Sequence, residues 1–368
     1  RQGWGWASGT PAGLAVRSTA GGGGGAGRRG TMGATSARSS AYPPGAPSGR
    51  HPGTTTRGVG VARDTIEEGA GDTYTDVVDE LREFADRLAV SGGAVARRMS
   101  REIAPGGLGA RSKSSVTDPV TVIDTAVEEH LRARVAGARP GDRVLGEEGG
   151  EHATAGTSSS LSSSSPPSES PGRVRWIIDP VDGTVNLLYG IPFTAVSVAA
   201  EIDGVVVAGA VHNIVTRETW TAGLGRGATL RGVDGAVTDL AASSCGTLSL
   251  ALVGTGFAYD SGVRAEQGRV VAELLPRIRD IRRCGSAALD LCMLATGRID
   301  AYYERCLKPW DHAAGALVAA EAGAIVVVST DDGVPTTAAA PGVAREFLDA
   351  LIALGGYPDP GGPPRLSS

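Results

Sequence analysis

Two aspartates, Asp179 and Asp182, lie three positions apart directly after the mainly apolar residues 174–178. Pro180 lies between them, and Gly-Thr follows. If residues 174–178 form a strand, both carboxylates lie at the edge of a sheet, where ligands reach them. Asp-Pro and Asp-Gly are also common turn dipeptides, and aspartate is depleted in strands. The pattern therefore indicates either a turn or a metal or phosphate site.

Asp124 shares a face with apolar residues of an expected helix. The apolar residues are Val127, Leu131 and Val135, which follow Asp124 in steps of three or four positions. An acid on the inward face near a helix start is unusual. Asp124 therefore either caps the helix or points into a site.

Two further acids lie where expected elements end or begin. Glu147 follows a short strand at residues 143–145, and Asp311 precedes a helix at residues 312–322. A solvated loop or a helix cap would explain each of them alone. Together with the two strand-end aspartates they are hard oxygen donors, which suit Mg²⁺, Mn²⁺ or Ca²⁺. Carboxylates between two Mg²⁺ ions about 3.5–4 Å apart recur in phosphoryl hydrolysis.

Gly183 and Thr184 add groups that a phosphate would need. Gly183 lets the backbone approach a phosphate closely, and the amides of both residues could donate to its oxygens. The Thr184 hydroxyl could orient a water and pass its proton towards Asp124, as a general-base relay.

Composition limits the class of protein. The chain has 368 residues, a net charge of −5 and a pI near 5.7, which argues against nucleic acid as the main ligand. The sequence has no apolar run of about 18 residues and no signal-peptide core, so we expect a cytoplasmic protein without a membrane segment. No C-x-x-C pair occurs, and we expect buried, reduced thiols at Cys245, Cys284, Cys292 and Cys306.

Low-complexity stretches separate the expected folded core from its tails. Residues 1–72 are rich in Gly, Ser, Thr and Arg, and we expect them to be disordered, like residues 357–368. The start at Arg1 rather than Met favours a fragment or an over-extended reading frame. Residues 152–173 read as a flexible Ser- and Pro-rich insertion.

The expected core has an N-terminal half at residues 73–240 and a C-terminal half at residues 241–356. The first half begins with an amphipathic helix whose apolar positions are Val77, Val78, Leu81, Phe84, Ala85 and Leu88. Its expected strands, with Asp203-Gly204 as a hairpin turn, are at 194–202, 205–211, 219–222 and 228–231. In the second half, strands at 250–254, 280–282, 300–304 and 324–328 alternate with helices at 264–275, 287–295, 312–322 and 343–354. This alternation predicts a layered α/β fold.

Three motifs resemble those of a known family. Residues 176–186, W-I-I-D-P-V-D-G-T-V-N, are similar to the D-P-x-D-G-T-x-N signature of the inositol monophosphatase family. Residues 310–315, W-D-H-A-A-G, resemble its second signature, W-D-x-A-A-G, and residues 146–148 resemble its G-E-E element. The resemblance covers about residues 73–355, and paired signatures in this order are specific.

The resemblance implies a Mg²⁺-dependent, lithium-sensitive phosphomonoesterase. It also implies an αβαβα sandwich of the sugar-phosphatase type, with an antiparallel half and a smaller mixed-sheet half, and a homodimer. By position, the implied metal ligands are Glu147, Asp179, the Val181 carbonyl, Asp182 and Asp311. The implied catalytic residues are Asp124, Thr184 and Glu147. The implied substrate contacts are Asp182, Gly183, Thr184, Ala287 and Glu304, and Lys113 matches a lysine of a catalytic loop.

Two features depart from the family pattern, and neither removes a ligand. Leu187 replaces a usual aromatic residue, and the insertion at residues 152–173 lies close to Glu147. The expected substrate is a small phosphorylated polyol, myo-inositol 1-phosphate, since Glu304 would repel a doubly phosphorylated one. Histidinol phosphate, fructose 1,6-bisphosphate and 3′-phosphonucleotides are the alternative substrates. A non-catalytic binding protein is the alternative function.

Overall fold

A computed structural model of the chain describes residues 71–102, 111–112, 119–153, 173–328 and 334–357. The chain divides into two units, residues 1–54 and 55–368, and every described residue belongs to the second. The expected tails lie outside the described residues, except for residues 71–72 and 357. Most of the expected insertion also lies outside them, but residues 152–153 belong to a strand and correct its first boundary.

The larger sheet is predominantly antiparallel. Its eight strands have the spatial order β10 (Val237–Asp239), β9 (Ala228–Arg231), β8 (Thr219–Gly223), β7 (Val205–Asn213), β6 (Ala195–Ile202), β5 (Val174–Asp182), β3 (Arg143–Gly146) and β4 (Gly150–Ala153). Asp203 and Gly204 have φ angles of 49° and 80°, which suit the predicted two-residue hairpin between β6 and β7. One pair, β3 and β5, is parallel, so the sheet is mixed rather than wholly antiparallel.

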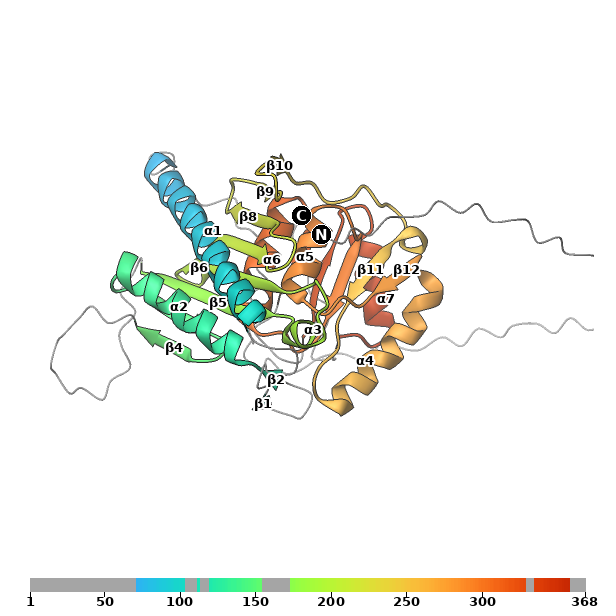
Figure 1. The fold of residues 1–368 in the computed structure, drawn as a ribbon. Helices are drawn as coiled ribbons and strands as arrows, with labels where there is room; N and C mark the ends of the chain where they lie inside the picture. Colours follow the sequence, from blue (N-terminus) through green and yellow to red (C-terminus); the bar gives the residue numbers. More distant parts are fainter. Residues whose placement is uncertain (1–70, 103–110, 113–118, 154–172, 329–333, 358–368) are drawn as a thin grey trace, which may run out of the picture. The chain divides into compact units, whose positions relative to one another are not determined.

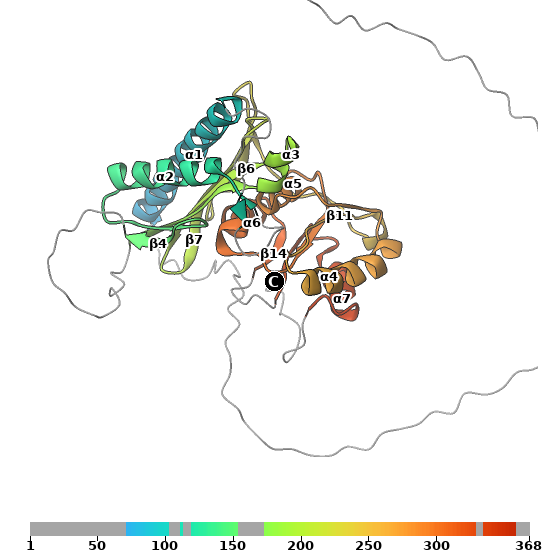
Figure 2. The same ribbon diagram turned by 60° about the horizontal axis from the view of Figure 1, so that its bottom comes forward.

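Side chains alternate along β5, so each face of the larger sheet has its own core. Trp176 and Ile178 pack with helices α1 (Gly71–Glu102) and α2 (Val122–Ala138). Ile177 packs with α5 (Ala287–Ala295) and α6 (Pro309–Glu321) on the opposite face. Figures 1 and 2 show α1 and α2 together on one side of this sheet.

The smaller sheet lies between α5 and α6 and an outer pair of helices. Its five strands have the order β12 (Asp280–Arg282), β11 (Leu252–Thr255), β13 (Ala301–Glu304), β15 (Thr336–Ala339) and β14 (Ile325–Val327), with both parallel and antiparallel pairs. Tyr302 of β13 packs with α5 and α6, and Tyr303 packs with α4 (Ser261–Leu274) and α7 (Ala344–Ala353). The layers are therefore αβαβα, which confirms the predicted fold.

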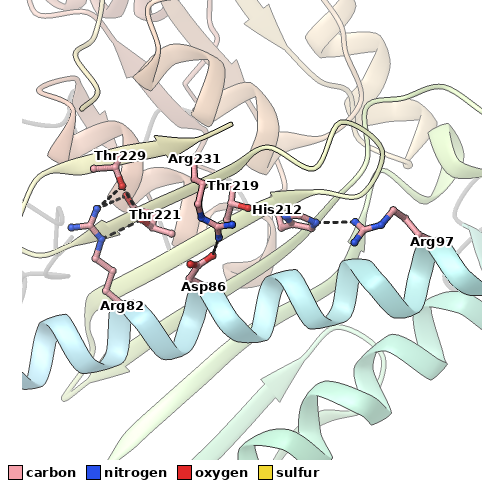
Figure 3. A network of polar contacts seen from close by, with 8 residues as sticks. All are labelled: Arg82, Asp86, Arg97, His212, Thr219, Thr221, Thr229 and Arg231. Atoms are coloured by element: carbon pink, nitrogen blue, oxygen red, sulfur yellow. Dashed lines mark hydrogen bonds and ion pairs between the residues drawn. The ribbon is translucent and has the colours of Figure 1, made fainter. Parts of the chain in front are cut away.

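Polar contacts tie α1 to the larger sheet (Figure 3). Arg82 of α1 donates to the Thr229 hydroxyl at 2.7 Å and to the Thr221 hydroxyl at 3.2 Å. Asp86, one turn later, pairs with Arg231 of β9. These contacts fix the helix along the strands in addition to its apolar face.

A buried histidine meets the C-terminal part of α1 (Figure 3). The Arg97 Nη1 lies 2.9 Å from His212 Nε2, and His212 Nδ1 lies 2.8 Å from the Thr219 hydroxyl. Because guanidinium nitrogens only donate, His212 Nε2 is the acceptor and the ring is neutral. Gly93 makes room for this ring, since a Cβ there would lie 2.3 Å from His212 Cδ2.

Several boundaries differ from those that the sequence predicts. β5 continues through Asp182, and α6 begins at Pro309, whose fixed φ suits a first helical turn. Val77 is 36% exposed, so it does not lie on the buried face of α1. The α-helices and strands that were not predicted are β1 (Arg111–Ser112), β2 (Pro119–Val120), α3 (Thr184–Tyr189), β4, β10 and β15. Such short segments show no period.

The cysteines and the helices bear on two further predictions. All four cysteines are free, as predicted, but only Cys292 among them is buried. Across the described ranges, no helix combines the length and the apolar character that crossing a membrane requires.

Candidate active site

The end of β5 carries its two aspartates on an irregular stretch. Asp179 pairs with Ser197 and Asp182 pairs with Ala195, and the register shifts between the two pairs. Asp179 Oδ1 accepts a hydrogen bond from the Val181 amide at 2.9 Å, which closes the bend. Both aspartates are buried. The turn and the strand end are therefore one structure, and strand irregularities of this kind are enriched beside active sites.

Gly183 turns the chain from β5 into α3. Its φ is 93°, in the left-handed region that favours glycine. A Cβ there would lie 2.9 Å from the Phe193 carbonyl oxygen and 3.1 Å from that of Gly285. This tight turn places Thr184 at the start of α3, directly after the two aspartates.

Asp124 has both roles that the sequence left open. As the third residue of α2, it accepts a hydrogen bond at Oδ2 from the Thr121 amide at 3.1 Å, within a capping box. Its Oδ1 accepts from the Thr184 hydroxyl at 2.8 Å. The same hydroxyl lies 3.1 Å from the Val181 carbonyl oxygen. Asp124 and Thr184 are both buried, so the structure brings the predicted pair together inside the protein.

Asp182 is held by the start of α5. Its Oδ2 accepts from the Ser286 hydroxyl and from the Ala288 amide, each at 2.7 Å. Burial raises the pKa of Asp182 to about 6, and these hydrogen bonds act in the opposite direction. Ala287, an expected substrate contact, lies between the two donors in sequence and is buried.

Glu147 and Asp311 reach the same region from distant segments. The Glu147 amide donates to the Ile178 carbonyl of β5 at 3.3 Å. Asp311 accepts from the Lys308 amide at 2.6 Å, so it is the third residue of α6 and not its N-cap. Burial and the negative charges of Glu147 and Asp182 raise the pKa of Asp311 well above its ordinary value. The acids therefore lie close enough to repel one another.

The donor set fits Mg²⁺ in its chemistry. It consists of carboxylates and the Val181 carbonyl, which are the hard oxygens that this ion prefers. A cation would also relieve the repulsion that raises the pKa of Asp311. Within the parts of the chain that the structure describes, no three His, Cys, Asp or Glu side chains form a group that could hold an ion. The metal-ligand assignments therefore stay predictions.

Two further acidic residues, Glu304 and Asp290, lie near Asp182. Glu304 on β13 accepts a hydrogen bond from the Tyr302 hydroxyl. Burial raises the pKa of Glu304 to about 7, and the Tyr302 hydrogen bond acts in the opposite direction. Burial also raises the pKa of Asp290 of α5 well above its ordinary value, followed by the charges of Glu304 and Asp182. This side of the region therefore holds two carboxyl groups whose protonated forms burial favours, and the charge of Arg283 lowers the pKa of both in the opposite direction.

Three of these residues were missed by the sequence reasoning. Ser286 had a usable signal, because a serine directly before a helix is a common N-cap. Asp290 had one as well, because it is an acid within an apolar helix, like Asp124. Tyr302 had no signal in the sequence, because only the folded structure shows that its hydroxyl donates to Glu304. Lys113, which was expected to belong to a catalytic loop, lies outside the described residues.

Comparisons with known proteins agree on one family. The model of the inositol monophosphatase family matches residues 77–353. Inositol-1-monophosphatase SuhB of Mycobacterium tuberculosis is 48% identical over 286 residues, which are 75% of this chain and 94% of that protein. The solved structure of Mycobacterium tuberculosis SuhB matches with a TM-score of 0.63 and 44% identity, over 76% of this chain and 98% of that one. Nus factor SuhB of Salmonella typhimurium is 35% identical over 216 residues, 58% of this chain and 73% of that protein.

Proposed function

Because the chain belongs to the inositol monophosphatase family and is a phosphatase, we propose that it catalyses Mg²⁺-dependent hydrolysis of a small phosphate monoester. The proposed substrate is myo-inositol 1-phosphate, which gives inositol and phosphate. One observation carries the proposal: the Thr184 hydroxyl donates to the buried Asp124 at 2.8 Å, directly beside the strand-end aspartates.

Thr184 and Asp124 would activate the attacking water. Because the Thr184 hydroxyl gives its proton to the hydrogen bond with Asp124, its oxygen has lone pairs available for a water. As the water oxygen bonds to phosphorus, the bond from phosphorus to the leaving polyol oxygen breaks. One water proton passes to Thr184 Oγ1, the threonine proton moves to Asp124 Oδ1, and the leaving oxygen takes a proton from solvent. The amides of Gly183 and Thr184 would donate to the phosphate oxygens.

The proposed holders of Mg²⁺ are Glu147, Asp179, the Val181 carbonyl, Asp182 and Asp311. When bound, the ion lowers the pKa of a water and stabilises charge on the leaving oxygen. Ser286 and the Ala288 amide keep the Asp182 carboxylate in one orientation, which would preorganise it for the ion.

The acidic side of the region supports a substrate with a single phosphate. Ala287 and Glu304 would contact its polyol part, since carboxylates accept hydrogen bonds from hydroxyls. Ionised Glu304 would repel the second phosphate of fructose 1,6-bisphosphate or a phosphonucleotide. Histidinol phosphate is compatible with ionised Glu304 because its amine is cationic.

Binding without catalysis is the second candidate function. A relative named Nus factor SuhB favours it, although that name describes the Salmonella protein. Against it, Asp124, Thr184 and every expected acidic ligand are present in this sequence. The cytoplasmic location and the homodimer stay predictions from the sequence.

Phosphate release by the purified full chain tests the proposal. The substrates are inositol 1-phosphate, histidinol phosphate, fructose 1,6-bisphosphate and 3′-phosphoadenosine 5′-phosphate, each with Mg²⁺ and with EDTA. We expect the highest kcat/KM for inositol 1-phosphate and no release with EDTA. Asp182→Asn should abolish turnover while circular dichroism shows an intact fold. No release from any substrate would contradict the enzymatic function, and near-normal turnover of Asp182→Asn would contradict its role as a ligand.

A further inference from the structure

We propose that Glu128 is a positioning residue that fixes the loop carrying Glu147 and thereby sets the affinity of the site for Mg²⁺. The inference rests on the proposed function, because it takes Glu147 as a metal ligand. Glu128 belongs to α2 and is 3% exposed, although a carboxylate gains nothing from burial unless it is fully paired.

The partners of Glu128 explain its burial. Its Oε2 accepts from the Glu148 amide at 2.8 Å, directly after Glu147. Its Oε1 accepts from the Gly149 amide at 2.8 Å and from Arg132 Nε at 2.8 Å. Two of the three donors are therefore backbone amides of the loop, so the carboxylate holds the main chain next to the proposed ligand.

Arg132 extends this contact to the strands on both sides of the loop. One turn after Glu128 on α2, its Nη1 donates to the Val144 carbonyl of β3 at 3.3 Å. Its Nη2 donates to the Gly150 carbonyl of β4 at 2.5 Å. The Glu128–Arg132 pair thus joins α2 to the β3–β4 hairpin at four backbone positions.

Gly146 at the end of β3 and Gly149 in the loop leave space for this carboxylate. A Cβ at Gly146 would lie 2.5 Å from Glu128 Oε1, and one at Gly149 would lie 2.7 Å from the same oxygen. Gly146 has no positive φ that would require glycine. Its small size therefore serves the approach of Glu128.

The position of Glu128 on α2 links the two parts of the proposed site. Asp124 lies one turn before it and accepts from the Thr184 hydroxyl, so a single helix orients both the proposed general base and the Glu147 loop. A ligand on a loop without such support must be ordered when the metal binds, and that ordering lowers affinity.

Metal titration of the full chain by calorimetry, without substrate, tests the inference. Glu128→Gln keeps the volume but turns an N–H group towards the Glu148 amide or the Gly149 amide, where only an acceptor fits. We expect Mg²⁺ or Mn²⁺ to bind about 10–100-fold more weakly, with kcat at saturating metal unchanged within about twofold. Glu147→Gln is the positive control, and Glu129→Gln, the exposed neighbour on α2, is the matched control and should bind like wild type.

Each result bears on the inference. Metal binding by Glu128→Gln that equals wild type, while Glu147→Gln is weakened, overturns it and leaves the proposed function intact. Glu128-dependent metal binding without hydrolysis of any phosphate supports the inference and overturns the function, whereas a wild type that binds no metal overturns both. If Glu128→Gln does not fold, Arg132→Lys is the second variant, because it removes the planar guanidinium that joins Glu128 to β3 and β4. This variant should weaken the binding of Mg²⁺ or Mn²⁺ about threefold or more, and unchanged metal binding would overturn the inference.

Discussion

The Thr184 hydroxyl donates to Asp124 Oδ1 at 2.8 Å, and this contact joins residues that are 60 positions apart in sequence. The second oxygen of Asp124 accepts from the Thr121 amide, so the carboxylate has a fixed orientation. Helix capping and the proposed proton relay therefore use different oxygens of one side chain, and a substitution that spares the cap would isolate the relay.

Asp124→Asn should lower kcat about 10²–10⁴-fold, because an amide is a much weaker base than a carboxylate. Thr184→Ser keeps the hydroxyl and should retain most of the activity, whereas Thr184→Val should resemble Asp124→Asn. Steady-state kinetics at saturating Mg²⁺ measure these effects, and calorimetry should show unchanged metal affinity for Asp124→Asn. Similar kcat values for Thr184→Val and wild type would exclude the relay.

Tyr302→Phe should move the pH dependence of substrate affinity upwards. The pKa of Glu304 is about 7, and the Tyr302 hydroxyl keeps it from rising further by stabilising the ionised form. If ionised Glu304 binds the substrate hydroxyls, affinity is complete well above that pKa and is lost as the pH falls through it. The variant should lose affinity at a higher pH, with kcat little changed. KM profiles between about pH 6 and about pH 9 measure the shift, and superimposable profiles for the two proteins would argue against this role of Glu304.

Local patterns predicted the main elements and most residues of the candidate site. The apolar run before Asp179 and the helical spacing around Asp124 are visible in single segments, because burial on one face imposes a period. The signatures around Asp182 and Asp311 then indicated the family. Whether these two residues lie close together depends on the fold, and the expected αβαβα fold came from the resemblance to that family.

The support of the site was not predictable in the same way. Ser286 and Asp182 are 104 positions apart, and Glu128 meets the Glu148 amide across 20 positions without a pattern that pairs them. Such contacts follow from tertiary packing and not from propensity. A smaller error concerns Asp311, for which the sequence suggested an N-cap. The N-cap is Lys308, and Asp311 lies three residues later, where its carboxylate accepts a hydrogen bond from the Lys308 amide.

Gly93→Ala should destabilise the protein by about 1–3 kcal/mol, because its Cβ would overlap the buried His212 ring. Gly137→Ala is the matched control on α2, where nothing lies within 4 Å of the new Cβ. That substitution should stabilise by about 0.5–1 kcal/mol through the lower backbone entropy of alanine in the unfolded chain. Urea unfolding of both variants measures the difference, and equal effects would show that α1 has room at Gly93.

His212 should make stability depend on pH. Burial, followed by the charge of Arg97, lowers the pKa of His212 from 6.5 to about 3. The unfolded chain therefore binds more protons than the folded one between these values, so stability is complete above about pH 6.5 and falls as the pH decreases. This contribution has a slope of at most about 1.4 kcal/mol per pH unit. His212→Gln should be less stable at neutral pH, but its free energy of unfolding should no longer show this dependence on pH. The control is His152→Gln, at an exposed position on β4, and it should keep the dependence. Urea unfolding at several pH values above the acid limb of the carboxylates measures both, and an unchanged slope in His212→Gln would show that folding does not lower the pKa of this ring.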